Sequence, residues 1–176
     1  MDWRRIFFDI VVAGNPSVSV QSSIIEDYQR KPEMKTIVCK NSKKKAEESL
    51  LPTATKILDK LGLSGEAMTL TGDCGLMEKV FAMGCFENLL HSLSVDAGAG
   101  DISTDNTSLF TGVRLPNLMI MLATLAANCG VNSKECYRSY CIGPPPSLYN
   151  LVQEMGCVDR ARDLSPGFNW YDIHLS

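Results

Sequence analysis

The sequence has few of the residues that build metal sites and catalytic centres. Its 176 residues include only two histidines, His91 and His174, and no two of its seven cysteines form a C-x-x-C pair. Zinc sites made from closely spaced cysteines are therefore disfavoured. A cysteine nucleophile would also have few partners that could act as its base. We predict no metal site and no bound cofactor.

Long apolar runs are also missing. The segment from Leu115 to Ala127 is shorter than the roughly 20 residues that a membrane-spanning helix needs, and it contains Asn117 and Thr124. The apolar N-terminal stretch resembles a signal peptide only weakly, because Asp9 interrupts it. We expect no membrane span and a soluble protein.

Neither sign of charge dominates the chain as a whole. The net charge is −3 and the pI is about 5.4, so nothing global favours nucleic acid or an anionic membrane. Residues 29–60 are locally basic, with nine Lys or Arg against four acids. At a predicted helix start in this stretch, where backbone donors and lysines together favour an anion, stand Lys40, Lys43, Lys44 and Lys45. An anion- or RNA-binding site is one hypothesis, and a solvated lysine surface is the simpler interpretation.

The residues that are abundant indicate one globular domain, because 45% of the chain is apolar and can form a sizeable core. Residues 1–72 are predicted to mix strands and helices, residues 73–164 to be helical, and residues 165–176 to form an aromatic tail. Several cysteines lie within apolar segments, where a free thiol behaves as a small hydrophobe. We therefore expect a reducing compartment, the cytoplasm.

The first third of the chain predicts short strands at residues 6–13, 36–39 and 67–70, each rich in β-branched or apolar residues. Residues 17–23 fit either the second strand of a hairpin or the start of a helix that ends before Pro32. A helix is predicted from Pro52 to Leu61, with Gly62 as its left-handed terminating residue.

A central buried helix is predicted at residues 115–129. Its contact stripe has helical spacing and consists of Leu115, Leu118, Met119, Leu122, Leu125, Ala126 and Cys129. Ile120 and Met121 lie off this stripe and could contact another subunit. Further helices are predicted from Asp73 to Leu93, from Ser133 to Cys141 and after the capping residue Ser147.

These elements predict a mostly helical α+β fold, with short strands in the N-terminal third and about six helices around the segment 115–129. A doubly wound α/β sheet is the alternative, because the stretches TIVC, AMTL and SLFTGV each precede a predicted helix.

Three functional hypotheses follow, of which the first is preferred. It describes a non-enzymatic interaction or assembly protein, cytosolic or viral, that self-associates through apolar helix faces and terminal segments; its candidate contacts include the tail aromatics Phe168, Trp170 and Tyr171. The second is a small α/β enzyme with Cys74 as a nucleophile at a helix N-terminus. The third is anion or RNA binding by the lysine run.

Overall fold

The computed structural model describes residues 6–40, 42, 44, 46–86, 116–124, 136–155 and 169–176. Within these ranges six strands form one sheet: β1 (Ile6–Val12), β2 (Lys35–Lys40), β3 (Glu66–Leu70), β4 (Leu118–Ala123), β5 (Cys136–Ile142) and β6 (Asn169–Leu175). The helices of the same ranges are α1 (Pro16–Arg30), α3 (Leu51–Lys60), α4 (Leu76–Phe86) and α7 (Leu148–Met155), and a π-helical turn, η2 (Ala46–Leu50), leads into α3.

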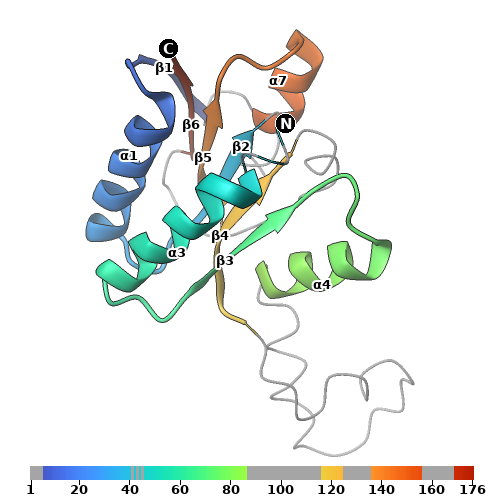
Figure 1. Cartoon of the computed structure of the whole chain (residues 1–176). Coiled ribbons are helices and arrows are strands. Elements are labelled where there is room, and N and C mark those ends of the chain that lie inside the picture. The colour runs from blue at the N-terminus through green and yellow to red at the C-terminus, as the bar shows by residue number, and fades with distance from the viewer. Residues whose placement is uncertain are drawn as a thin grey trace, which may run out of the picture.

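The sheet is entirely parallel and has the strand order β1-β6-β5-β2-β4-β3. Helices α1 and α3 cover one face, and α4 and α7 cover the other (Figure 1). Each face has its own apolar core, one beneath α1 and α3 and one beneath α4 and α7. A parallel sheet covered on both faces is expected to have interior strands that are apolar at almost every position.

The prediction of a central helix is wrong, because the apolar residues at its centre form the interior strand β4. All six residues of β4 are buried; Ile120 faces the core under α1 and α3, and Met121 faces the opposite core. A segment that is apolar on every side fits a helix buried all around, but it fits a central parallel strand equally well. The mostly helical α+β prediction is therefore wrong, and the alternative, a doubly wound α/β sheet, is confirmed.

Two other predicted assignments change in the same way. The short helix expected from Ser133 to Cys141 is replaced by β5, and the expected aromatic tail contributes β6, which lies inside the sheet between β1 and β5. The expected helical part, residues 73–164, thus contains two of the six strands. The predicted loop at 95–111 and the end of the helix predicted to reach Leu93 lie outside the described residues.

The strands predicted at residues 6–13, 36–39 and 67–70 are confirmed as β1, β2 and β3. Residues 17–23 are helical, as one of the two interpretations required. The Asn15 side chain caps α1 by accepting hydrogen bonds from the backbone N–H groups of Ser17 and Val18, and Pro16 occupies the first turn, where no N–H donor is needed.

The predicted end of α3 is also confirmed. Gly62 has φ +67° and donates its N–H to the carbonyl of Asp59, while the Leu63 N–H bonds to the carbonyl of Leu58. These two bonds form a Schellman motif, which satisfies carbonyls that the helix end leaves free. Ser147 caps α7 as expected, since its hydroxyl accepts the Asn150 N–H at 3.2 Å. By contrast, α4 begins at Leu76 rather than at Asp73.

Strand β1 forms one edge of the sheet, and the Asp9 side chain protects the centre of this edge from pairing with another strand. The Ala13 N–H donates to Leu175 of β6, so the alternation of a parallel strand points the Ile10 N–H away from the sheet. The Asp9 carboxylate accepts that outward N–H at 2.8 Å. Since Phe8, Ile10 and Val12 are exposed, this edge would otherwise be an apolar template for another strand.

We predict that Asp9→Ala increases self-association, because the substitution frees the Ile10 N–H and removes the only charge in β1. Light scattering after size-exclusion chromatography is expected to give a larger mass for Asp9→Ala than for the unaltered chain at equal concentration. Glu26→Ala, which removes an exposed negative charge from α1, is the control. Equal masses for all three proteins would contradict the edge-protection role.

Candidate binding site at the carboxyl edge of the sheet

Strands β2 and β5 are neighbours whose chains leave the sheet in opposite directions. After β2 the chain continues through η2 to α3 on one face, whereas after β5 it continues to α7 on the other. Such a point of divergence opens a crevice at the carboxyl ends of parallel strands, which is the usual place of ligand binding in open α/β sheets.

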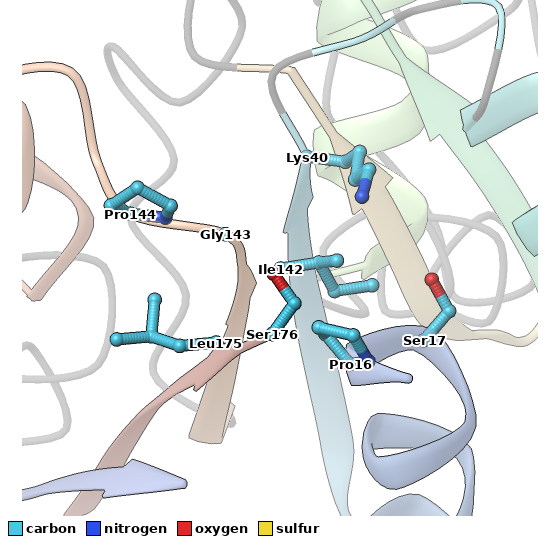
Figure 2. Close-up of a pocket in the computed structure, with 8 residues that line it drawn as sticks. All are labelled: Pro16, Ser17, Lys40, Ile142, Gly143, Pro144, Leu175 and Ser176. Carbon is cyan, nitrogen blue, oxygen red and sulfur yellow. The ribbon is translucent and has the colours of Figure 1, made fainter. Parts of the chain in front are cut away.

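A pocket of about 590 Å³ lies at this crevice (Figure 2). Strand β2 contributes its last residue, strands β5 and β6 contribute their carboxyl ends with the residues that follow, and α1 contributes its first turn. The lining residues are Pro16, Ser17, Lys40, Ile142, Gly143, Pro144, Leu175 and Ser176. The volume falls within the range of about 300–1,000 Å³ that is typical of small-ligand pockets.

Backbone hydrogen bonds hold the rim of this pocket together. Gly143 has φ +90°, a conformation that side chains disfavour, and its N–H donates to the carbonyl of His174 at 2.9 Å. The Ala13 N–H donates to the carbonyl of Leu175 at 2.8 Å. The ends of β1, β5 and β6 are thereby fixed relative to one another.

The pocket has a positive side. Lys40 carries the only charged side chain among the described residues that line it. The first N–H groups of α1 are already used within the helix, since the Asn15 side chain accepts two of them and its carbonyl accepts the Ser19 N–H. Attraction for an anion therefore comes from the Lys40 ammonium group and from the positive end of the α1 dipole.

A buried ion cluster ties α1 to the two strands beneath it. Arg138 of β5 contacts the Asp27 carboxylate of α1 at 2.9 Å and the Asp172 carboxylate of β6 at 2.7 Å. The Tyr140 hydroxyl donates to the second oxygen of Asp27. Burial raises the pKa of Asp27 above its usual range, against the lowering effects of Tyr140 and Arg138. Removing one partner of such a cluster leaves a buried charge unpaired, so the cluster fixes the position of α1.

His174 lies at the end of β6, one residue before the pocket wall. Its imidazole is fully buried, its Nδ1 atom lies 2.9 Å from the Ser19 hydroxyl of α1, and its ring packs beside that of Tyr140. Burial lowers the pKa of His174 below its usual value. The imidazole therefore joins β6 to the first turn of α1 close to the pocket.

A second buried carboxyl group lies on the opposite face. Glu154 of α7 is fully buried and accepts the hydroxyl hydrogen of Tyr171 from β6, while its other oxygen, Oε1, has no hydrogen-bond partner. Burial raises the pKa of Glu154, so the protonated form is favoured. The neighbouring Cys141 thiol donates to the Gly143 carbonyl at 3.1 Å, which connects this cluster to the pocket rim.

The predicted anion-binding lysines are only partly described. Lys40 lies in the pocket and Lys44 is exposed, while Lys43 and Lys45 fall outside the described residues.

Cys74, the predicted nucleophile, lies between β3 and α4, as the strand-to-helix hypothesis required. Its sulfur accepts the Thr71 N–H at 3.4 Å and lies 3.6 Å from the Thr71 hydroxyl. Neither group is a base. His174 of β6 contacts the Ser19 hydroxyl of α1, and His91 falls outside the described residues.

The predicted partner contacts are not surface residues where the structure describes them. Ile120, Met121 and Tyr171 have 0% exposure. Phe168 and the side chain of Trp170 lie outside the described residues. In the same ranges no cluster of three or more His, Cys, Asp or Glu suits a metal ion, and none of the described helices is long and apolar enough to cross a membrane.

Sequence comparisons give no relatives: no protein-family model matches the chain, and no curated protein matches it significantly. Comparison with solved structures finds several proteins of similar fold. The chain resembles domain 2 of the DEAD-box helicase Mss116p bound to an RNA duplex, with TM-score 0.62, 11% identity, and coverage of 97% of this chain and 54% of that chain. It also resembles the Mycobacterium smegmatis helicase Lhr bound to ssDNA and AMP-PNP (TM-score 0.57, 14% identity, 96% and 19% coverage).

A third similar structure is the E. coli DEAD-box protein SrmB bound to the regulator RraA, with TM-score 0.58, 9% identity, and coverage of 96% of this chain and 77% of that chain. At these identities the likeness shows the fold, which is the RecA-like α/β fold of helicase domains. The chain spans about half of the Mss116p chain and about a fifth of the Lhr chain.

These findings overturn the preferred functional hypothesis of a non-enzymatic, helical assembly protein. That hypothesis depended on an excess of apolar surface on a central helix, and the residues concerned form a buried strand in a fold shared with helicase domains. Nothing in the comparisons supports a viral or structural helical protein. The alternatives that place an anion site or an enzyme on an α/β fold agree better with the structure.

We predict that Glu154→Gln stabilises the protein increasingly as the pH rises. The folded state keeps a proton on Glu154 at pH values where the unfolded chain releases it, so stability is lost as the pH rises from the unfolded pKa through the folded pKa. Glutamine has no proton to lose. Urea unfolding between about pH 4 and pH 8 should show a free-energy gain over the unaltered chain that grows as the pH rises.

The control for this measurement is Glu48→Gln, at an exposed position of η2. Its stability difference from the unaltered chain should stay nearly constant over the same pH range. A Glu154→Gln difference that is independent of pH would show that Glu154 is ionised in the folded protein.

Proposed function

We propose that this chain is a RecA-like domain that binds a strand of nucleic acid through its phosphates at the carboxyl edge of the sheet. The observation that carries the proposal is the pocket between the ends of β2, β5 and β6, with Lys40 on its wall. Ligands of open parallel sheets bind at this position. The Mss116p and Lhr structures, which share the fold, contain an RNA duplex and single-stranded DNA respectively.

The spacing of the lysines supports a ligand with repeated negative charges. Lys40 is followed by Lys43, Lys44 and Lys45, and the described member of that group, Lys44, is exposed. A single small anion needs one such contact, whereas a phosphodiester chain offers a new charge at every nucleotide. Lysine contacts to phosphates supply affinity that is independent of base sequence and that falls as salt rises.

The proposal is limited to binding. The sequence contains no G-x-x-x-x-G-K-[ST] loop, the arrangement that cradles the phosphates of ATP in P-loop proteins.

Self-association and a reducing compartment remain predictions. The five described cysteines are all free, which agrees with a reducing compartment.

We predict that Lys40→Ala weakens binding of a single-stranded oligonucleotide about tenfold, equivalent to about 1.4 kcal/mol. Loss of one phosphate contact should also lower the slope of log affinity against log salt by about 0.7. Fluorescence anisotropy over a salt series measures both quantities. A variant with alanine at Lys43, Lys44 and Lys45 should lower the slope further.

Lys60→Ala is the matched control, because it removes the same charge from the last turn of α3, at the opposite edge of the sheet. Its affinity and salt slope should equal those of the unaltered chain. Absence of salt-dependent binding, or an equal effect of Lys40→Ala and Lys60→Ala, would refute the proposal.

A further inference from the structure

The pocket wall is more apolar than a phosphate site requires. Four of its eight lining residues carry apolar side chains: Pro16, Ile142, Pro144 and Leu175. The polar side chains are those of Lys40, Ser17 and Ser176. A bare phosphate could use the polar groups, but it would gain nothing from the apolar side chains of Pro16, Pro144 and Leu175. The Ile142 side chain is only 4% exposed and packs in the core beneath α1 and α3.

Apolar side chains lie on both sides of the pocket, and the charged side chain of Lys40 lies on one of them. Figure 2 shows Lys40 and Pro16 on one side of the hollow and Pro144 and Leu175 on the other, with Ile142 between them. A ligand that matches this pocket has a largely apolar body and one negatively charged group next to it. A nucleotide has both parts, since its base can lie against apolar side chains while its phosphate contacts a cation.

We infer that the pocket accommodates one nucleotide unit, with the base between the proline-bearing walls and the phosphate at Lys40. The inference rests on the proposed function and specifies its ligand. The nucleotide can belong to a strand or be a free mononucleotide, because both present the same chemistry to the pocket.

A strand that places one base in the pocket must leave that base unstacked. In single-stranded nucleic acid this costs little, whereas a duplex has to break a base pair and its stacking, which costs a few kcal/mol. The pocket therefore favours single strands over duplexes of the same sequence. Contacts between the lysines and the phosphate backbone of the nucleic acid do not distinguish single strands from duplexes.

The experiment fills the pocket without altering its charge. Ser17→Phe places a large side chain in the wall contributed by α1, and Ser176→Trp does so from the exposed residue after β6, where it is not expected to affect folding. Ser22→Phe, at an exposed position of the same helix outside the pocket, is the control. Circular dichroism and thermal unfolding confirm that each variant is folded.

Three probes are titrated by anisotropy or by competition: a short single-stranded DNA, the corresponding duplex, and AMP. The unaltered chain is expected to bind the single strand at least tenfold more tightly than the duplex. Ser17→Phe and Ser176→Trp should remove this preference and leave weak, salt-dependent binding to both. Competition by AMP that both variants abolish would identify a free nucleotide as an additional ligand.

The two proposals fail in different ways. Equal affinity for single strand and duplex, with no effect of either pocket-filling variant on any probe, would overturn the nucleotide pocket while the Lys40→Ala effect still supported backbone binding. Lack of salt-dependent binding to both nucleic acids would overturn the proposed function. In that case only AMP binding that is sensitive to Ser17→Phe would sustain the pocket.

Discussion

The parallel pairing of six strands is the constraint on which the rest of the molecule depends. It brings every carboxyl end to the same edge of the sheet, so Lys40, Gly143 and Ser176, which are far apart in the sequence, meet around one pocket. It also requires helices on both faces. Because of that requirement, the segments that follow β2 and β5 run to opposite faces of the sheet, and the pocket lies between the ends of these two strands.

Local signals allowed part of this fold to be predicted from the sequence. The strands of the first third, the proline and glycine that bound α3, and the Ser147 cap were recognised because each depends on residues adjacent in the chain. Strand β4 was missed because its LMIMLA sequence faces a core on both sides. Without the alternation of a half-buried strand, an apolar run of this kind cannot be distinguished from a buried helix by periodicity.

The candidate site was less predictable than the fold. Lys40 was singled out by the lysine run that it begins, but Ser17, Ile142 and Ser176 join it only through the strand order. The sequence around Gly143 and Pro144 suggested a stiff spacer, and in the structure these residues form part of the pocket rim. The ion pairs of Arg138 likewise join residues more than 30 and more than 100 positions apart, which no local pattern reveals.

The pairing of β1 with β6 has a consequence for how the chain folds during synthesis. Strand β1 emerges from the ribosome first of the six, yet its neighbour in the sheet, residues 169–175, emerges last. At translation rates of about 5–20 residues per second, β1 waits roughly ten to thirty seconds for its partner. During that interval β1 lacks its partner strand, and Asp9, its one charged residue, disfavours pairing with another strand.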